Sequence, residues 1–252
     1  MTLHELDRLL SEYLRIPDFP NDPSQNGIQV ERSGGDLRKI ALGVDACLET
    51  IRRAADQGAD LLLTHHGLLW GQSEPLRGLY YGRVRALMES NMALYACHLP
   101  LDAHPECGNN YGLAARLGLR DIRPCCEWRG YTIGVTGALP EPLSPDDLIR
   151  KLFPSAQGDC IVLPFGKPRA ERAAIVTGGG GEEVSQARDA GADLFITGEI
   201  GHTQFHTAEE LGITVIAAGH YRTETIGVQL LGQKITRDTG IETVFIDVPT
   251  GL

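Results

Sequence analysis

The 252-residue sequence lacks the features that mark several common classes of protein. No apolar run approaches the roughly 20 residues of a membrane-spanning helix, so we expect no membrane segment. Met1–Asp7 has the pattern of a helix start, not the basic and then apolar pattern of a signal peptide. Basic residues are in the minority, with 23 Lys and Arg against 33 Asp and Glu, which gives a formal charge of −10. This balance argues against a protein that binds nucleic acid by neutralising phosphates.

The six cysteines include no C-x-x-C pair, so the sequence does not support a zinc ribbon or a thioredoxin-like redox motif. Cys125 and Cys126 are adjacent and could oxidise, but we favour their interpretation as small buried thiols. This cysteine usage fits a reducing, cytoplasmic setting.

Strand-like and helix-like segments alternate along the chain, which predicts an α/β fold with a mostly parallel or mixed sheet. Helices are expected at Leu3–Leu14, Leu48–Gln57 and Asn110–Leu117, and after the Ser144-Pro145 start signal. Strands are expected at Ile28–Val30, Ile40–Val44, Leu61–Leu63, Met92–Ala96, Tyr131–Val135, near Ile161, and at Ala174–Val176, Leu194–Ile196 and Thr214–Ala217.

An internal similarity predicts how these elements are grouped. The segment Leu48–Thr64 aligns with Gly181–Thr197 at an offset of 133, and eight of the 17 positions are identical. Met92–Asp102 aligns with Thr214–Glu224 at an offset of 122. We therefore expect two related α/β units that arose by duplication. The predicted boundaries are 1–125 for the first unit, 126–232 for the second, and 233–252 for a C-terminal segment, with a strand at Glu242–Val248, that returns to the first unit.

Polar side chains follow four of the predicted strands, at the end where α/β sheets place ligands. They are His65 and His66, then His98 and Asp102, then Glu199, and finally His220 and Glu224. The second alignment pairs His98 with His220 and Asp102 with Glu224, so each unit offers a strand that ends in His-x-x-x-carboxylate.

Imidazole and carboxylate groups in this pattern favour a metal site in the cleft between the two units. Adjacent side chains on extended backbone diverge, so His65 and His66 can both be ligands only with two metals, or one metal and one partner, nearby. His220 and Glu224 share one face if a helix begins near Gly219. A carboxylate such as Asp102 or Glu224 can bridge two cations. The mixture of ligands suits Zn, Mn or Fe better than Ca.

Other candidate residues favour structural roles. Gly178–Gly181 lacks the Walker Lys-Ser/Thr and precedes two glutamates, so we interpret it as a tight turn. His202 and His206 are expected on a helix, at the surface or behind the ligands. His4 and His104 are expected at the surface, and Trp70 is expected to pack under its loop.

Several motifs resemble the GTP cyclohydrolase 1 type 2 homologs, also called Nif-three-like or YbgI-type proteins, in the same order along nearly the whole chain. The matching segments are Gln25–Val30, Thr64–Trp70, Leu101-Asp102, Gly108–Asn110, Gly191–Glu199 and Gly219–Glu224. The resemblance implies two divalent metal ions per chain and the ligands His65, His66, Asp102, His220 and Glu224, with Glu224 as the bridge. It also implies a toroidal homohexamer, a trimer of dimers, with His98 beside the metals.

Two classes of function follow from this site. The first is a metal-dependent hydrolase acting on a nucleotide or a similar small molecule, with His98 or Glu199 transferring the proton. For GTP, the family label, hydroxide would open the ring at the base carbon between the two imidazole nitrogens. The second is a non-enzymatic, ring-shaped metal-binding assembly or adaptor. A metal store or chaperone is disfavoured because the chain has no His- or Cys-rich tract.

Overall fold

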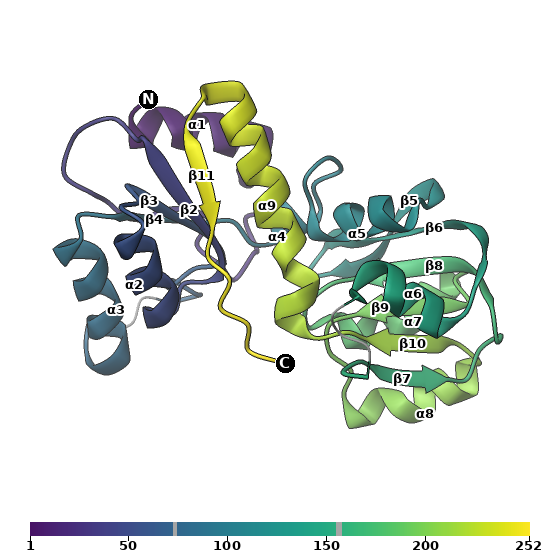
Figure 1. Ribbon diagram of the computed structural model, residues 1–252. Helices are drawn as coiled ribbons and strands as arrows, with labels where there is room; N and C mark the ends of the chain where they lie inside the picture. Colours follow the sequence, from purple (N-terminus) through teal and green to yellow (C-terminus); the bar gives the residue numbers. More distant parts are fainter. Residues whose placement is uncertain (73–74, 155–157) are drawn as a thin grey trace. The chain divides into compact units, whose positions relative to one another are not determined.

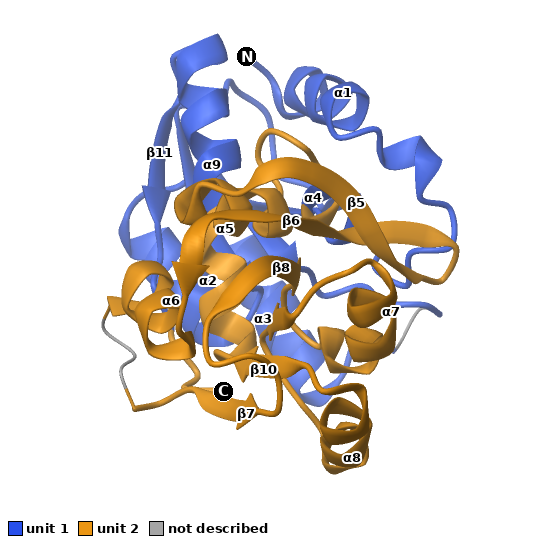
Figure 2. Cartoon of the chain, turned by 90° about the vertical axis from the view of Figure 1, so that its right-hand side faces the viewer, with its two compact units in different colours: residues 1–101, 227–248 blue, residues 102–226, 249–252 orange. Residues whose placement is uncertain are grey.

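Two separate β-sheets organise the chain, which the computed structural model describes for residues 1–72, 75–154 and 158–252. Unit 1 comprises Met1–Leu101 and Gly227–Val248, and unit 2 comprises Asp102–Ile226 and Pro249–Leu252 (Figure 2). The predicted α/β class is confirmed, with helices and two mixed sheets (Figure 1).

The unit boundaries differ from the predicted ones. The first unit ends at Leu101 and not at residue 125, because the helix that follows packs within unit 2. Asn110 on this helix donates from its side chain to the carbonyl of Ile133, at 2.8 Å, in a central strand of unit 2. Near the C-terminus, the chain rejoins unit 1 from Gly227, because the last strand pairs with a strand of that unit.

Unit 1 contains a five-stranded sheet with the order β1-β4-β3-β2-β11. Strands β2, β3, β4 and β11 are parallel to one another, and β1 runs antiparallel to β4. The strands are β1 (Gly27–Val30), β2 (Lys39–Asp45), β3 (Leu61–His66), β4 (Ala93–Ala96) and β11 (Glu242–Phe245). The helical segments that begin in this unit are α1 (Leu3–Tyr13), η1 (Ile16–Asp18), α2 (Leu48–Asp56), α3 (Gly78–Glu89) and α4 (Leu99–Asp102).

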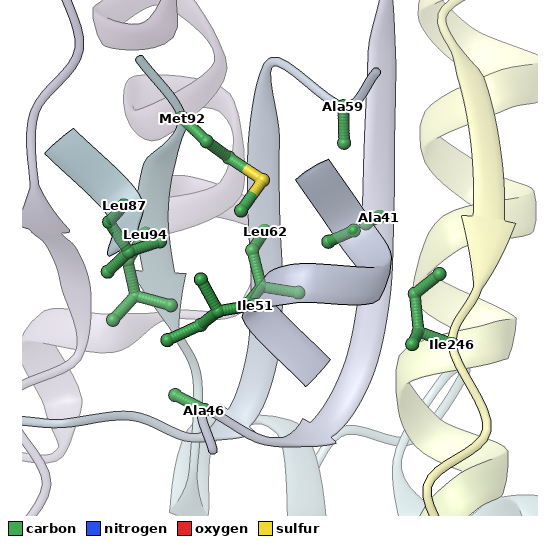
Figure 3. Packing of buried hydrophobic residues seen from close by; sticks show 10 residues of the cluster. Ala41, Ala46, Ile51, Ala59, Leu62, Leu87, Met92, Leu94 and Ile246 are labelled. Atoms are coloured by element: carbon green, nitrogen blue, oxygen red, sulfur yellow. The ribbon is translucent and has the colours of Figure 1, made fainter. Parts of the chain in front are cut away.

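Local sequence signals explain the first elements of unit 1. Thr2 and Glu5 form the expected capping box at the start of α1, and the helix buries Leu3, Leu6 and Leu10. Strand β3 is buried from Leu61 to His65, as expected for a parallel strand covered on both faces. Ile51 of α2 packs with Leu62, Met92 and Leu94 in the core of the unit (Figure 3).

Unit 2 contains a six-stranded sheet with the order β5-β6-β8-β9-β10-β7. Strands β8, β9 and β10 are parallel, whereas β5, β6 and β7 pair antiparallel with their neighbours. The strands are β5 (Arg120–Trp128), β6 (Tyr131–Leu143), β7 (Ile161–Pro164), β8 (Ala170–Val176), β9 (Leu194–Thr197) and β10 (Thr214–Ala217). The helical segments are α5 (Asn109–Leu117), α6 (Pro145–Leu152), η3 (Gly180–Glu183), α7 (Val184–Asp189), α8 (His202–Leu211) and α9 (His220–Thr239), whose later residues belong to unit 1.

Two further expectations from the sequence are met in this part of the chain. Ser144 caps α6 through a capping box with Asp147, and Pro145 opens the helix. Cys125 and Cys126 are both buried in β5, and the Cys126 thiol donates to the Cys125 sulfur at 3.5 Å. Within the described residues, no helix combines the length and the apolar character needed to cross a membrane.

Candidate metal centre

Three histidines of unit 1 gather where two neighbouring parallel strands end. His65 and His66 are the last residues of β3, and His98 follows β4. The His65 ring lies 4.6 Å from the His66 ring and 5.1 Å from the His98 ring, between centroids. Each residue offers one nitrogen, and the three nitrogens lie within 4.8 Å of one another. The arrangement can hold a metal ion.

Each of these imidazoles is held through its Nδ1 atom. His65 donates to the carbonyl of Cys97 at 2.9 Å, and His66 and His98 donate to carboxylates at 2.8 Å. The carboxylates belong to Asp45 and Asp22. With Nδ1 carrying the donated proton, Nε2 would be the coordinating nitrogen, which is how proteins usually orient metal-binding histidines.

The two carboxylates were not predicted as site residues. Asp45 ends β2 and lies directly opposite His66 in the parallel ladder. Its position as a carboxylate at the end of the strand next to β3 is therefore the sequence signal from which Asp45 could have been predicted. Asp22 lies 76 residues before His98, in the proline-rich loop, and no local pattern connects the two.

Asp22 organises the loop around His98. Its side chain is fully buried and accepts hydrogen bonds from the backbone of Ser24 and Leu99 and from the Asn26 amide. Burial acts to raise the pKa of Asp22, but the hydrogen bond from His98 and the other donors lower that pKa below its ordinary value. An ionised Asp22 therefore fixes the orientation of the imidazole.

The loop that follows His66 is held close to the sheet. Gln29 accepts from the backbone of Leu68 and Leu69, at 2.6 and 3.0 Å. A Cβ on Gly67 would lie 2.4 Å from the Gln29 side chain and 2.6 Å from the Cβ of Ala96. Glycine is thus required by the close approach of the loop, not by an unusual backbone angle.

The prediction that Trp70 packs under this loop is wrong. The side chain remains 38% exposed, and its ring lies 5.0 Å from the His98 ring and 5.9 Å from the His66 ring. Its indole nitrogen donates to the carbonyl of Gly67 at 2.9 Å, so the loop itself turns the ring towards the histidines.

Unit 2 carries one imidazole and two carboxylates: His220 and Glu224 follow strand β10, and Asp102 is the last residue of α4. His220 and Glu224 lie on the first turns of α9, with Nε2 and Oε2 3.2 Å apart, as their spacing predicts. Asp102 ends α4, and its ligand oxygen lies within 4.8 Å of that of Glu224. Asn109 donates to Asp102 at 2.8 Å. The carboxylates of Asp102 and Glu224 are both buried.

Glu199 contacts His220 from the side opposite Glu224. The His220 Nδ1 atom lies 2.6 Å from the Glu199 carboxylate, which is 59% exposed. Burial lowers the pKa of His220, but hydrogen bonds and charge from Glu224 and then Glu199 outweigh it and raise the pKa to about 9. Without a metal, His220 is therefore protonated at neutral pH.

A glycine loop, predicted as a tight turn, also covers the His220–Glu224 pair. A Cβ on Gly178 would lie 2.0 Å from Glu224 Oε1 and 2.9 Å from His220 Nε2. The φ angle of Gly178 is +63°, a conformation that favours glycine. Its amide donates to the Thr223 hydroxyl at 3.0 Å. The backbone can approach the ligand atoms this closely only because the position has no side chain.

The chemistry of these donors fits a divalent transition metal. Imidazole nitrogen suits Zn, Mn and Fe, and buried carboxylate oxygen supplies the negative charge that a bare cation requires. The structure brings together His65, His66 and His98 in unit 1, and Asp102, His220 and Glu224 in unit 2, with Glu199 beside His220.

The remaining histidines differ in their environments. His4 is exposed, and so are His202 and His206 on α8. The prediction that His104 lies at the surface is wrong, since only 8% of it is exposed. Its Nδ1 accepts from the backbone amides of Glu106 and Cys107, so the ring stabilises a turn.

Comparison with known proteins agrees with the fold. Residues 1–251 match the family described as Duf34/NIF3 (NGG1p interacting factor 3). The chain belongs to this family.

Relatives named "GTP cyclohydrolase 1 type 2 homolog" match at nearly full length. The Treponema pallidum protein is 44% identical and covers all of both chains. The Deinococcus radiodurans protein is also 44% identical, over 98% of this chain and 94% of its own.

Solved structures show the same fold. The protein ybgI, described as of unknown function, has a TM-score of 0.92 and 34% identity over all of both chains. TTHA1606 from Thermus thermophilus has a TM-score of 0.90 and 41% identity, again over all of both chains. "Reduced HcgD" from Methanocaldococcus jannaschii, at 24% identity and a TM-score of 0.84, shares the fold.

Proposed function

We propose that the chain is a dinuclear metal-dependent hydrolase that acts on a nucleotide or a similar small molecule. The observation that carries this proposal is the set of anchored imidazoles. Three histidines at adjacent strand ends each donate from Nδ1 to a fixed acceptor, which assigns Nε2 to coordination at His65 and His66 and to proton transfer at His98. A surface or purely structural histidine does not need this arrangement.

The proposed ligands are His65, His66, Asp102, His220 and Glu224, which would hold two ions of Zn, Mn or Fe. The all-imidazole set of unit 1 has no negative charge, whereas unit 2 supplies two buried carboxylates. Glu224 is the proposed bridge.

Two divalent ions held by these residues would lower the pKa of a bound water and stabilise developing negative charge. The residues around them provide the proton transfer. His98 donates from Nδ1 to Asp22, so its Nε2 can accept a proton, and the ionised Asp22 stabilises the imidazolium that forms. Glu199 is the second candidate, because its exposed carboxylate can pass a proton between His220 Nδ1 and solvent.

The substrate class comes from the relatives, whose name refers to a GTP cyclohydrolase. We propose a nucleotide on that basis. We also propose a cytoplasmic setting, which the six free thiols support, since this compartment keeps cysteines reduced.

The second candidate function is a non-enzymatic ring-shaped assembly, and one observation favours self-association. Leu79, Tyr81 and Met88 of α3 are 84%, 52% and 69% exposed, which is unusual for large apolar side chains on one helix. We propose a homohexamer, and light scattering of Met88→Glu against the unchanged protein tests whether this helix lies in a subunit interface.

Metal analysis followed by a hydrolase assay tests the main proposal. Protein saturated with Zn or Mn should contain two ions per chain, and fewer than one would refute the dinuclear site. Glu224→Gln should lose metal and nucleotide hydrolysis together. Glu210→Gln, an exposed carboxylate on α8, is the matched control and should retain both. Equal activity in Glu224→Gln would remove that residue from the reaction.

A further inference from the structure

A surface pocket of about 870 Å³ lies in unit 1, between the loop after β3 and the start of α3. Its wall includes two aromatic side chains, Trp70 and Tyr80, and two arginines, Arg77 and Arg83. Leu68 and Leu69 complete the side nearest the sheet. The volume is in the range of pockets that hold drug-sized ligands.

Trp70 is shared between this pocket and the histidine cluster. Its ring lines the pocket and also lies 5.0 Å from the ring of His98. The hydrogen bond from the indole to Gly67 holds the ring in this position. A planar group stacked on Trp70 would therefore lie next to the proposed metal ligands of unit 1.

The two arginines give the pocket a positive charge, whereas the whole chain has a net charge of −10. Among the described residues, neither Arg77 nor Arg83 forms an ion pair, and Arg83 is half-buried. Arg85 on the same helix differs, since it pairs with Glu89 at 2.7 Å. Guanidinium groups that have no carboxylate partner among the described residues favour an anion in the pocket, and their planar donors match phosphate.

We propose that this pocket binds a compound with a planar ring and a phosphate group, with the ring on Trp70 and the phosphate on Arg77 and Arg83. The proposal rests on the proposed function in one respect, because it identifies where the substrate of that site lies. The pocket itself uses no proposed metal ligand, so ligand binding can be measured separately from metal binding and hydrolysis.

Calorimetric titration of the full-length protein with GMP, guanosine and tripolyphosphate tests the proposal. GMP should bind best, and Arg83→Gln and Arg77→Gln should each weaken GMP binding about tenfold, since charged hydrogen bonds are lost. Trp70→Leu should weaken binding of GMP and leave tripolyphosphate unchanged. Arg85→Gln is the matched control on α3 and should bind GMP like the unchanged protein. Circular dichroism and metal content of each variant should equal those of the unchanged protein.

The same titration after treatment with a chelator separates the two proposals. GMP binding that survives metal removal and is weakened by Arg83→Gln supports the pocket, even if no hydrolysis is found. Equal GMP affinity in Arg83→Gln, or equal affinity for guanosine and GMP, would overturn the phosphate site. Binding of tripolyphosphate without any preference for GMP would overturn the ring site. Failure of all three compounds to bind would overturn the whole proposal.

Discussion

Units 1 and 2 contain the same arrangement of four strands with different side chains at the strand ends. In unit 1 the order is β1-β4-β3-β2, and in unit 2 it is β7-β10-β9-β8. In each case three consecutive strands are parallel, and the preceding strand in the chain pairs antiparallel with the last of them. The sequence repeat predicts this correspondence, and it extends beyond the aligned segments.

The shared Gly-Ala-Asp sequence has the same structural role in both units. Asp60 accepts from the backbone amides of Arg38 and Lys39, where β2 begins. Asp193 accepts from the amides of Glu171 and Arg172 near the start of β8. Each aspartate also has a cationic partner from the segment before that strand: Arg32 in unit 1 and Lys167 in unit 2.

The difference between the units begins directly after the shared threonine, Thr64 or Thr197, that ends the first alignment. Where unit 1 has His65 and His66, unit 2 has Gly198 and Glu199. A Cβ on Gly198 would lie 2.6 Å from the Gly178 carbonyl and 2.8 Å from the His220 Cα. An imidazole cannot be placed there. The same arrangement of four strands therefore places imidazoles at its strand ends in unit 1 and mainly carboxylates in unit 2.

The largest effect is expected when either of the two equivalent aspartates, Asp60 or Asp193, is replaced. Asp60→Ala and Asp193→Ala should each destabilise the protein by about 2–4 kcal/mol, because buried backbone donors and a cation lose their partner. Asp60→Ala should cost more, since Arg32 is 12% exposed and Lys167 is 57% exposed. Urea denaturation measures the free energy of unfolding of both variants. An unchanged stability of either variant would show that Asp60 and Asp193 do not have the same structural role.

The next prediction concerns the carboxylates that orient the histidines of unit 1. Asp45→Asn and Asp22→Asn should weaken metal binding by about 10–100-fold, because they disturb the orientation of His66 and His98. Asp36→Asn, which changes an exposed carboxylate of the same unit, is the control. Competition with a chromophoric chelator gives the affinities. If Asp45→Asn binds metal like the control, His66 is not a ligand held by Asp45.

In unit 2 the raised pKa of His220 predicts a pH dependence. The pKa of about 9 lies above the ordinary value of about 6.5. In the metal-free protein this interaction stabilises the fold fully below pH 6.5 and is lost as the pH rises through 9. Metal must displace the proton, so affinity should rise up to about tenfold per pH unit until about pH 9. Chelator competition at several pH values checks the slope, which His220→Gln should reduce.

The smallest effect is expected at Glu183, which occupies the position of Thr50 in the alignment. Burial raises the pKa of Glu183 to about 7. The protonated form is therefore favoured in the folded protein, and stability falls as the pH rises through 7. Glu183→Gln should stabilise the protein by about 1 kcal/mol at pH 8 and leave it unchanged at pH 4. Thermal melts of the variant and the unchanged protein at pH 4 and pH 8 measure this effect. An equal change in melting temperature at the two pH values would contradict the prediction.

The elements that sequence reasoning predicts best are those with strong local signals. The helix starts at Thr2 and Ser144 and the buried parallel strands β3 and β9 are found where they were expected. Strand β5 was not predicted, because its first half is exposed and rich in charge, and it is a strand only through its pairing with β6.

For the candidate site, sequence reasoning finds the residues at strand ends and misses those that hold them. His65, His66 and His98 do converge, since parallel strands end at one edge of a sheet. The contact of Asp22 with His98 and the exposed position of Trp70 depend on the path by which loops fold back onto the sheet. Neither the spacing nor the periodicity of the sequence contains that information. The predicted unit boundary at residue 125 differs from the observed one for a similar reason, because tertiary packing places α5 in unit 2.

The pairing of Asp45 with His66 has a consequence for the lengths of chain that the family can tolerate. Asp60 holds the amides of Arg38 and Lys39, and this hydrogen bonding fixes the register of β2 up to Asp45. An insertion before Arg38 lengthens a loop and leaves that register intact. A single residue inserted between Lys39 and Asp45 would turn Asp45 to the other face of the sheet and away from His66. Among members of the family, insertions and deletions should therefore accumulate before Arg38 and be excluded within β2.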